Sequence, residues 1–233
     1  MRIALQPAYV LHHRAYRETS VILDLLTQDH GRISAVARGV RQARSPLKPL
    51  LQPFIPLLVS WQGRSELMTL LAAEPDGHTQ RLTGENLLSG LYLNELLVRI
   101  MPKYDAHPGL YTIYQQTLLE LTNPDLLQKS LRLFEKNLLE ALGYGLQLMY
   151  DTHSNEISAE RIYRFHADRG FELCQNPAEA PTTLFSGKSL LALADEQLQD
   201  ETILREIKRL MRLALAPLLG HHPINSRQLY GFK

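Results

Sequence analysis

The first 79 residues alternate strand-length apolar segments with turn-forming pieces, and this pattern restricts the fold more than any other feature of the sequence. The strand-length segments are rich in β-branched or aromatic residues. They are AYVLHHRAY, SVILDLLT, GRISAVARGV, FIPLLVSW and ELMTLLAAE. Five short strands suit a small closed barrel, and an oligonucleotide-binding (OB) barrel is the first candidate. From the spacing alone, an SH3-like barrel is almost as good a candidate.

Near residue 80 the apolar period changes from that of strands to that of helices. The pattern predicts helices over 85–102, 108–121, 124–143, 186–195 and 201–219, and a β-hairpin over 162–174. The net charge changes sign at the same place: the first 79 residues hold nine Lys and Arg against six Asp and Glu, and the rest hold sixteen against eighteen. The sequence therefore predicts an α+β chain. An OB-fold domain is expected over 1–79, and an α-helical domain over 80–233 that contains a small hairpin region at about 146–185.

Three of these helices have a defined apolar side. The first is expected to bury Leu87, Leu88, Leu91, Leu96 and Ile100. The third has Asn123 as its cap and is expected to bury Leu127, Leu131, Phe134, Leu138 and Leu142. The last is expected to bury Ile203, Ile207, Leu210, Ala214 and Leu218.

The segment Gly31–Ser65 concentrates positive charge, because it contains six Lys and Arg and no Asp or Glu. They are Arg32, Arg38, Arg41, Arg44, Lys48 and Arg64. Alternation places Arg32 and Arg38 on one face of a strand, and prolines after Gly39 indicate a long loop. A solvated face explains such a segment about as well as a polyanion surface. In the second case the cations would neutralise phosphates of DNA, which is the main source of affinity that does not depend on base sequence.

Two predicted helices carry basic stripes that are expected to be exposed. One consists of Lys129, Arg132 and Lys136, and the other of Arg205, Lys208, Arg209 and Arg212. The first stripe has Leu133 and Leu139 beside it, so it suits a groove for an acidic peptide with an apolar end. The second is a competing partner site, an extension of a DNA path, or the solvated outer face of an amphipathic helix.

Tyr16 and Trp61 are candidate platforms on which bases could stack, although packing in the core is the commoner fate of such residues. For catalysis the sequence offers little. The pairs His12–His13 and His221–His222 lack metal-site spacing, and no nucleophile elbow or phosphate-binding glycine loop occurs. We therefore expect no catalytic site, cofactor or small-molecule substrate.

The chain also lacks the marks of a secreted or membrane protein. Its start has no apolar core of a secretory signal, and no apolar run is long enough to span a bilayer. The single cysteine, Cys174, excludes an internal disulfide. These features predict a cytoplasmic protein.

Several segments together resemble RecO, the bacterial recombination mediator family, in the family's own order. They are AYVLHHRAYRETSVILDLLTQDHGRISAVARGVR, LKPLLQPF, GLYLNELLVRIMP, LRLFEKNLLEALGYG and RLMRLALAPLLGHHPINSRQLY. The resemblance implies an OB barrel followed by a helical domain. It also implies a non-enzymatic, nucleoid-associated protein that binds single- and double-stranded DNA and anneals complementary strands. Implied partners are the acidic C-terminal tail of single-strand-binding protein (SSB), and RecR, with which the family loads RecA.

Two further expectations accompany the resemblance. The family's DNA surface would correspond here to the six cations of Gly31–Ser65. RecO relatives often carry a four-cysteine zinc site in the hairpin region, but this chain has only Cys174 there, so we expect no metal. The alternative function is a protein-interaction adaptor recruited to SSB-coated DNA, with only incidental DNA contact.

Overall fold

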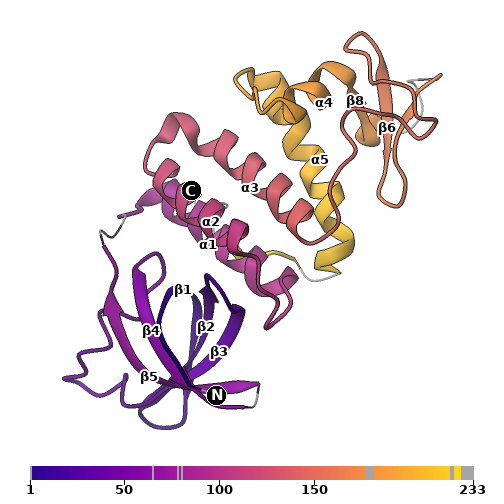
Figure 1. Cartoon of the computed structure of the whole chain (residues 1–233). Coiled ribbons are helices and arrows are strands. Elements are labelled where there is room, and N and C mark those ends of the chain that lie inside the picture. The colour runs from indigo at the N-terminus through magenta and orange to yellow at the C-terminus, as the bar shows by residue number, and fades with distance from the viewer. Residues whose placement is uncertain are drawn as a thin grey trace. The chain divides into compact units, whose positions relative to one another are not determined.

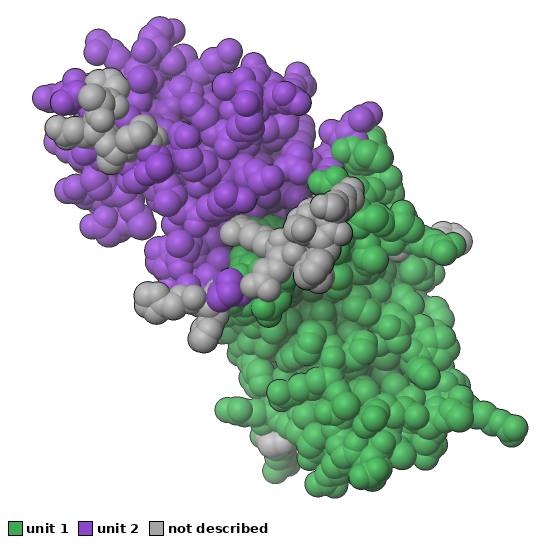
Figure 2. Space-filling view, turned by 180° about the vertical axis from the view of Figure 1, so that it is seen from behind, with its two compact units in different colours: residues 1–124, 224–233 green, residues 125–223 purple. Residues whose placement is uncertain are grey.

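The chain forms two compact units in a computed structural model that describes residues 2–64, 66–77, 79, 81–176, 181–220 and 223–226. The first unit contains residues 1–124 and 224–233, and the second contains residues 125–223 (Figure 2). The barrel and the first two helices belong to the first unit. The compact units and the predicted domains thus divide the chain at different residues.

Five strands close into a barrel in the order β1-β2-β3-β5-β4 (Figure 1). They are β1 (Arg2–Tyr16), β2 (Ser20–Thr27), β3 (Gly31–Ala37), β4 (Pro56–Gln62) and β5 (Leu67–Pro75). Neighbours pair antiparallel except β3 and β5, which are parallel over Ser34–Val36 and Leu67–Thr69. This crossover makes the five-stranded Greek-key barrel of the OB fold, so the predicted fold class is confirmed and the SH3-like alternative is excluded.

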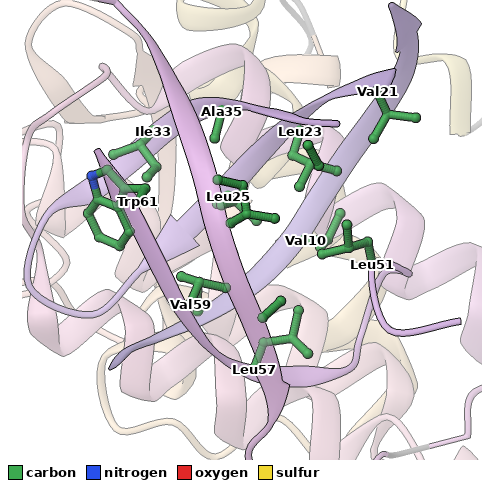
Figure 3. Close-up of a cluster of buried hydrophobic side chains, with 14 of the residues drawn as sticks. Val10, Val21, Leu23, Leu25, Ile33, Ala35, Leu51, Leu57, Val59 and Trp61 are labelled. Carbon is green, nitrogen blue, oxygen red and sulfur yellow. The ribbon is translucent and has the colours of Figure 1, made fainter. Parts of the chain in front are cut away.

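The barrel core is filled by alternate residues of each strand, because successive side chains point to opposite faces (Figure 3). On β2 and β3 these inward residues are Val21, Leu23, Leu25, Ile33, Ala35 and Ala37. The β3–β4 loop (residues 38–55) adds buried Val40 and Leu51 to the same cluster. The loop is therefore part of the core and closes the barrel at the end where β3 finishes.

Two helices, α1 (Gly84–Ile100) and α2 (Pro108–Glu120), cover the outer side of β1. Asn94 donates from Nδ2 to the Leu11 carbonyl at 3.0 Å and accepts the Tyr114 hydroxyl at 2.6 Å. The ring of Tyr9 packs against the rings of Tyr111 and Tyr114, with centroids 5.6 and 5.2 Å away. Burial raises the pKa of Tyr114 well above its ordinary value. These contacts remove β1 at Tyr9 and Leu11 from solvent.

The predicted buried side of α1 was wrong for Leu87, which is among the exposed apolar residues. Leu96 is buried as predicted, and Leu88, Leu91 and Ile100 are half-buried. The helix also buries Tyr92, Leu93 and Leu97. Leucines occur almost all round this helix, so their period does not select one face.

The segment after α1, residues 101–105, lies along the edge of β3, and we call it the strap. Lys103 forms a parallel bridge with Arg32, and the Tyr104 amide donates to the Arg32 carbonyl at 2.9 Å. The Tyr104 hydroxyl donates to the Glu66 carbonyl at 2.6 Å. The strap thus continues the sheet beyond the short β3–β5 pairing.

Residues 224–226 return to α1 in the first unit. The Glu95 carboxylate accepts the amides of Asn225 and Ser226, both at 2.8 Å, and the Ser226 hydroxyl at 2.8 Å. Desolvation raises the pKa of Glu95, but these hydrogen bonds and Arg99 outweigh it, so the pKa lies below its ordinary value. An ionised carboxylate therefore fixes this end of the chain to α1.

The second unit combines three helices with a small sheet (Figure 1). The helices are α3 (Leu127–Ala141), α4 (Gly187–Ala194) and α5 (Glu201–Leu219). The strands are β6 (Ile162–His166), β7 (Gly170–Leu173) and β8 (Leu184–Ser186), in the order β7-β6-β8. The predicted hairpin is present as β6 and β7, whereas the sequence analysis missed β8. The 3-10 turn η1 (Pro124–Leu126) precedes α3, so Asn123 is not the N-cap of that helix.

A turn at residues 149–157 precedes the hairpin, in the region where the resemblance implies a zinc site for relatives. Its Asp151 carboxylate accepts the amides of His153 and Asn155, both at 2.9 Å, and the Asn155 side-chain amide at 3.1 Å. Within the described parts of the chain, no group of three or more His, Cys, Asp or Glu side chains is placed to hold a metal ion. Structural zinc takes four thiolate or imidazole ligands, whereas this turn is held by amides bound to the Asp151 carboxylate, so the residues here do not fit zinc.

Candidate nucleic-acid interface

The β3–β4 loop presents four of the predicted DNA-binding cations to solvent. A series of turns shapes it, with backbone bonds from Gln42 to Gly39 at 3.2 Å and from Leu51 to Leu47 at 2.9 Å. Leu47, Leu50 and Leu51 point into the barrel cluster. Between these anchors the exposed side chains are those of Arg38, Arg41, Arg44 and Lys48. The leucines therefore attach the loop backbone to the barrel core, and the loop cations remain exposed on it.

The β1–β2 turn is attached to this loop through Arg41. The Arg41 amide donates to the Thr19 carbonyl at 2.8 Å, and its Nη1 donates to the Arg17 carbonyl at 3.0 Å. The Arg17 guanidinium lies over the half-buried Tyr16 ring, 5.2 Å from its centroid. These bonds bring the two loops and their cations together at one end of the barrel.

Arg32 is not part of this surface, which corrects the expectation that it shares an exposed face with Arg38. Its side chain is only 12% exposed, its Nε donates to the Met101 carbonyl at 2.9 Å, and its Nη1 lies 3.5 Å from the Asp24 carboxylate. Burial lowers the pKa of Arg32, and the charge of Asp24 opposes this shift. Arg32 fastens the strap to β3.

Arg64 is exposed but lies elsewhere on the barrel. It precedes β5, which runs parallel to β3 and begins with Leu67 beside Ser34, so Arg64 lies toward the start of β3. Arg38 directly follows Ala37, at the other end of β3. The structure therefore does not bring Arg64 together with the four loop cations, and its role in DNA binding stays a prediction.

Trp61 belongs to the barrel core, which corrects the expectation that it could serve as a stacking platform. Its side chain points among the core residues, and the residue is 3% exposed (Figure 3). Its ring meets the His30 ring edge-on, with centroids 5.3 Å apart. No face of the indole is left for a base.

The expected stripe on α3 is not an exposed cationic surface. Arg132 is buried and pairs with Glu135, which is also buried, at 3.0 Å. Lys136 pairs with Glu196 at 2.9 Å, and Lys129 is half-buried. These pairings correct the prediction that α3 offers the better site for an acidic partner.

The stripe on α5 keeps three of its four members exposed, namely Arg205, Lys208 and Arg212. Arg209 turns inward, donates to the Leu184 carbonyl and lies over the Phe185 ring, 4.7 Å from its centroid. Arg209 therefore joins α5 to β8 and is removed from the candidate partner site. Of the two histidine pairs, His12 and His13 are exposed on β1, whereas His221 and His222 lie outside the described residues.

The sequence analysis missed Arg14 and Arg17, which the structure places beside the predicted cations. Both are exposed, Arg14 on β1 and Arg17 in the following turn. They lie outside the acid-free segment Gly31–Ser65, in the first hairpin. Arg14 and Tyr16 share one face of the predicted strand 8–16, and this is the signal that could have found Arg14.

The closed Greek-key barrel with a basic loop places the chain in the class of OB-fold proteins with a surface suited to nucleic acids. Family models agree with this class: Recombination protein O N terminal matches residues 1–77, and Recombination protein O C terminal matches residues 81–228. The chain belongs to the RecO family of DNA repair proteins, as the sequence resemblance predicts.

Individual relatives match along almost their whole length. "DNA repair protein RecO" of Coxiella burnetii (strain RSA 331 / Henzerling II) is 48% identical, over 98% of each chain. The protein of the same name from Alkalilimnicola ehrlichii is 48% identical, over 98% of this chain and 91% of its own. That of Cellvibrio japonicus is 46% identical, over 99% and 98%. Among the described residues, no helix is long and apolar enough to cross a membrane.

Proposed function

We propose that the chain is a non-enzymatic recombination mediator that binds single- and double-stranded DNA on the β3–β4 loop and anneals complementary strands. The observation that supports this most is the set of four exposed cations, Arg38, Arg41, Arg44 and Lys48, on a loop anchored in the barrel core. Cations that neutralise two backbones at once lower their repulsion and raise their local concentration. Pairing is then accelerated without bond chemistry. The proposal places this activity in the cytoplasm, on the chromosomal DNA.

Binding should depend strongly on salt, because phosphate contacts release counterions. Four contacts to a single strand give a slope of log affinity against log salt of about −3, at roughly −0.7 per contact. The double variant Arg38→Glu, Arg44→Glu should flatten this slope to about −1.4 or less and abolish annealing. Fluorescence anisotropy of a labelled oligonucleotide across a salt series measures the slope, and a strand-pairing assay measures annealing.

The matched control is the double charge reversal Arg161→Glu, Arg169→Glu, which changes two exposed arginines of the second unit. It should leave slope and annealing as in the wild type. If the loop variant anneals like the wild type, the mediator proposal is wrong and the adaptor alternative stands.

We further propose that the acidic SSB tail binds the exposed cations of α5, and that the chain acts with RecR to load RecA, as the family resemblance implies. Charge complementarity supports α5 over α3, because Arg205 and Arg212 are exposed, whereas Arg132 and Lys136 of α3 already have carboxylate partners. The double variant Arg205→Glu, Arg212→Glu should weaken binding of a tail peptide at least about tenfold, the effect of losing one charged contact. Isothermal titration with the peptide measures this.

Lys129→Glu on α3 serves as the comparison and should leave peptide affinity unchanged. The opposite pattern, with Lys129→Glu losing the peptide and the α5 variant keeping it, would return the partner site to α3. Neither variant touches the barrel, so DNA binding should persist in both.

A further inference from the structure

One face of the barrel is divided into a covered and an uncovered part. On β2, Leu23 and Leu25 point into the core, so Ser20, Ile22 and Asp24 point outward. Directly paired residues share a face. The pairs Arg14–Ile22 and Tyr16–Ser20 therefore place Arg14 and Tyr16 on the outer face of β1.

β3 contributes to the same face on the other side of β2 (Figure 1). Ile22 pairs with Val36, which is therefore on the outer face, and Arg38 lies two residues further at the end of this strand. Adjacent strands are about 4.8 Å apart, so β1 and β3 are about 10 Å apart across β2. Tyr16 is the last residue of β1, and Arg38 directly follows the last residue of β3. An aromatic residue thus lies between two arginines, Arg14 on its own strand and Arg38 across the sheet.

Ser20 and Ile22 on β2 are buried at this end of the face, so the accessible groups are side chains of β1 and β3 on either side of them. Tyr9 and Leu11, earlier on β1, are each 3% exposed beneath α1 and α2, whereas Arg14 and Arg38 are exposed. The face of β2 and β3 is the surface on which OB barrels bind oligonucleotides. Among the described residues of this face, Arg14 and Arg38 next to the β1–β2 turn are exposed, and Tyr16 is half-buried.

The planar guanidinium of Arg17 packs over the ring of Tyr16. Arg17 has a φ of +52°, unusual for a residue with a side chain, and its guanidinium lies over the ring at 5.2 Å from the centroid. Arg41 holds this turn through the Arg17 and Thr19 carbonyls. The half-buried ring is therefore oriented by the loop of the proposed DNA site, and its contact with a guanidinium shows that it suits a flat group such as a base.

We propose that Tyr16 binds one unpaired base by stacking, while Arg14 and Arg38 contact the phosphates on either side of it. The ligand class is single-stranded nucleic acid, because the faces of paired bases inside a duplex are covered by their neighbours. Stacking on Tyr16 gives the barrel a preference for single-stranded over double-stranded DNA. The loop cations do not provide this preference, because they contact the phosphates of either form. The inference rests on the proposed function in using the same end of the barrel.

The test compares three labelled probes of equal length by fluorescence anisotropy: an oligo(dT) strand, an abasic deoxyribose-phosphate strand and a duplex. The Tyr16→Ala variant should bind oligo(dT) about 5- to 150-fold more weakly, which is the loss of one base–aromatic stack. It should bind the abasic strand and the duplex as the wild type does, which also shows that it is folded. Tyr16→Phe keeps the ring and should behave as the wild type with all three probes.

Other outcomes overturn the inference. They are an unchanged affinity of Tyr16→Ala for oligo(dT), an equal loss with all three probes, or a Tyr16→Phe variant as weak as Tyr16→Ala. A different result would contradict the proposed function. In that case the double variant Arg38→Glu, Arg44→Glu would bind the abasic strand and the duplex as tightly as the wild type does. A wild type that binds none of the probes contradicts both.

Discussion

Replacement of Arg132 by Ala should destabilise the second unit by about 3–5 kcal/mol, because it leaves a buried carboxylate without its cation. The Arg132 side chain is 5% exposed and that of Glu135 is 0% exposed, and their closest atoms are 3.0 Å apart. Taking a charge out of water is costly, and the neighbouring opposite charge offsets that cost only while both are present. Urea unfolding followed by circular dichroism measures the loss.

Two variants show that the effect comes from the pair. Arg132→Met with Glu135→Leu removes both charges and should recover most of the lost stability. Lys129→Ala, on the same helix, should change stability by no more than about 0.5 kcal/mol. If Arg132→Ala is as stable as the wild type but fails to bind the SSB tail, Arg132 is a partner residue after all.

Replacement of Gly31 by Ala should cost about 3–5 kcal/mol, because it combines an unfavourable backbone with the loss of the strap. Gly31 has a φ of +64°, and an added Cβ would lie 2.0 Å from the Asp105 carbonyl oxygen. The strap must then move away, which breaks its bonds to the Arg32 carbonyl, the Arg32 side chain and the Glu66 carbonyl. Hydrogen exchange should show faster exchange of the Tyr104 amide.

Gly77→Ala is the matched control. Gly77 has a φ of +89°, and an added Cβ would meet nothing within 4 Å. This variant should lose only the roughly 1–2 kcal/mol of a left-handed alanine and keep the Tyr104 amide protected. Equal losses in the two variants would mean that the strap contributes nothing to the barrel.

Elements with a strong local pattern could be predicted from the sequence almost to the residue. The segment SVILDLLT is β2, Ser20–Thr27, and the basic amphipathic stretch 201–219 is α5, Glu201–Leu219. In both, the apolar period and the flanking turn residues point to one structure. β8 has only three residues, and its pairing with β6 is set by tertiary contacts, so no local signal marks it.

The candidate site was only partly predictable for a different reason. A period shows which residues share a face but not what covers that face. Arg32, Arg132 and Arg209 all have the expected position on their strand or helix, and the strap, Glu135 and β8 then bury or bind them. The loop cations stay exposed because the leucines of the loop, and not its arginines, enter the core.

The strap also bears on how copies of this protein behave when they are crowded. β3 pairs with β5 only from Ser34 onward, so without the strap the edge at Arg32 would present unpaired backbone groups. Such an edge is a template on which another chain can add a strand and start aggregation. With its edge occupied by Lys103 and Tyr104, the barrel offers no such template there, even at high local concentration.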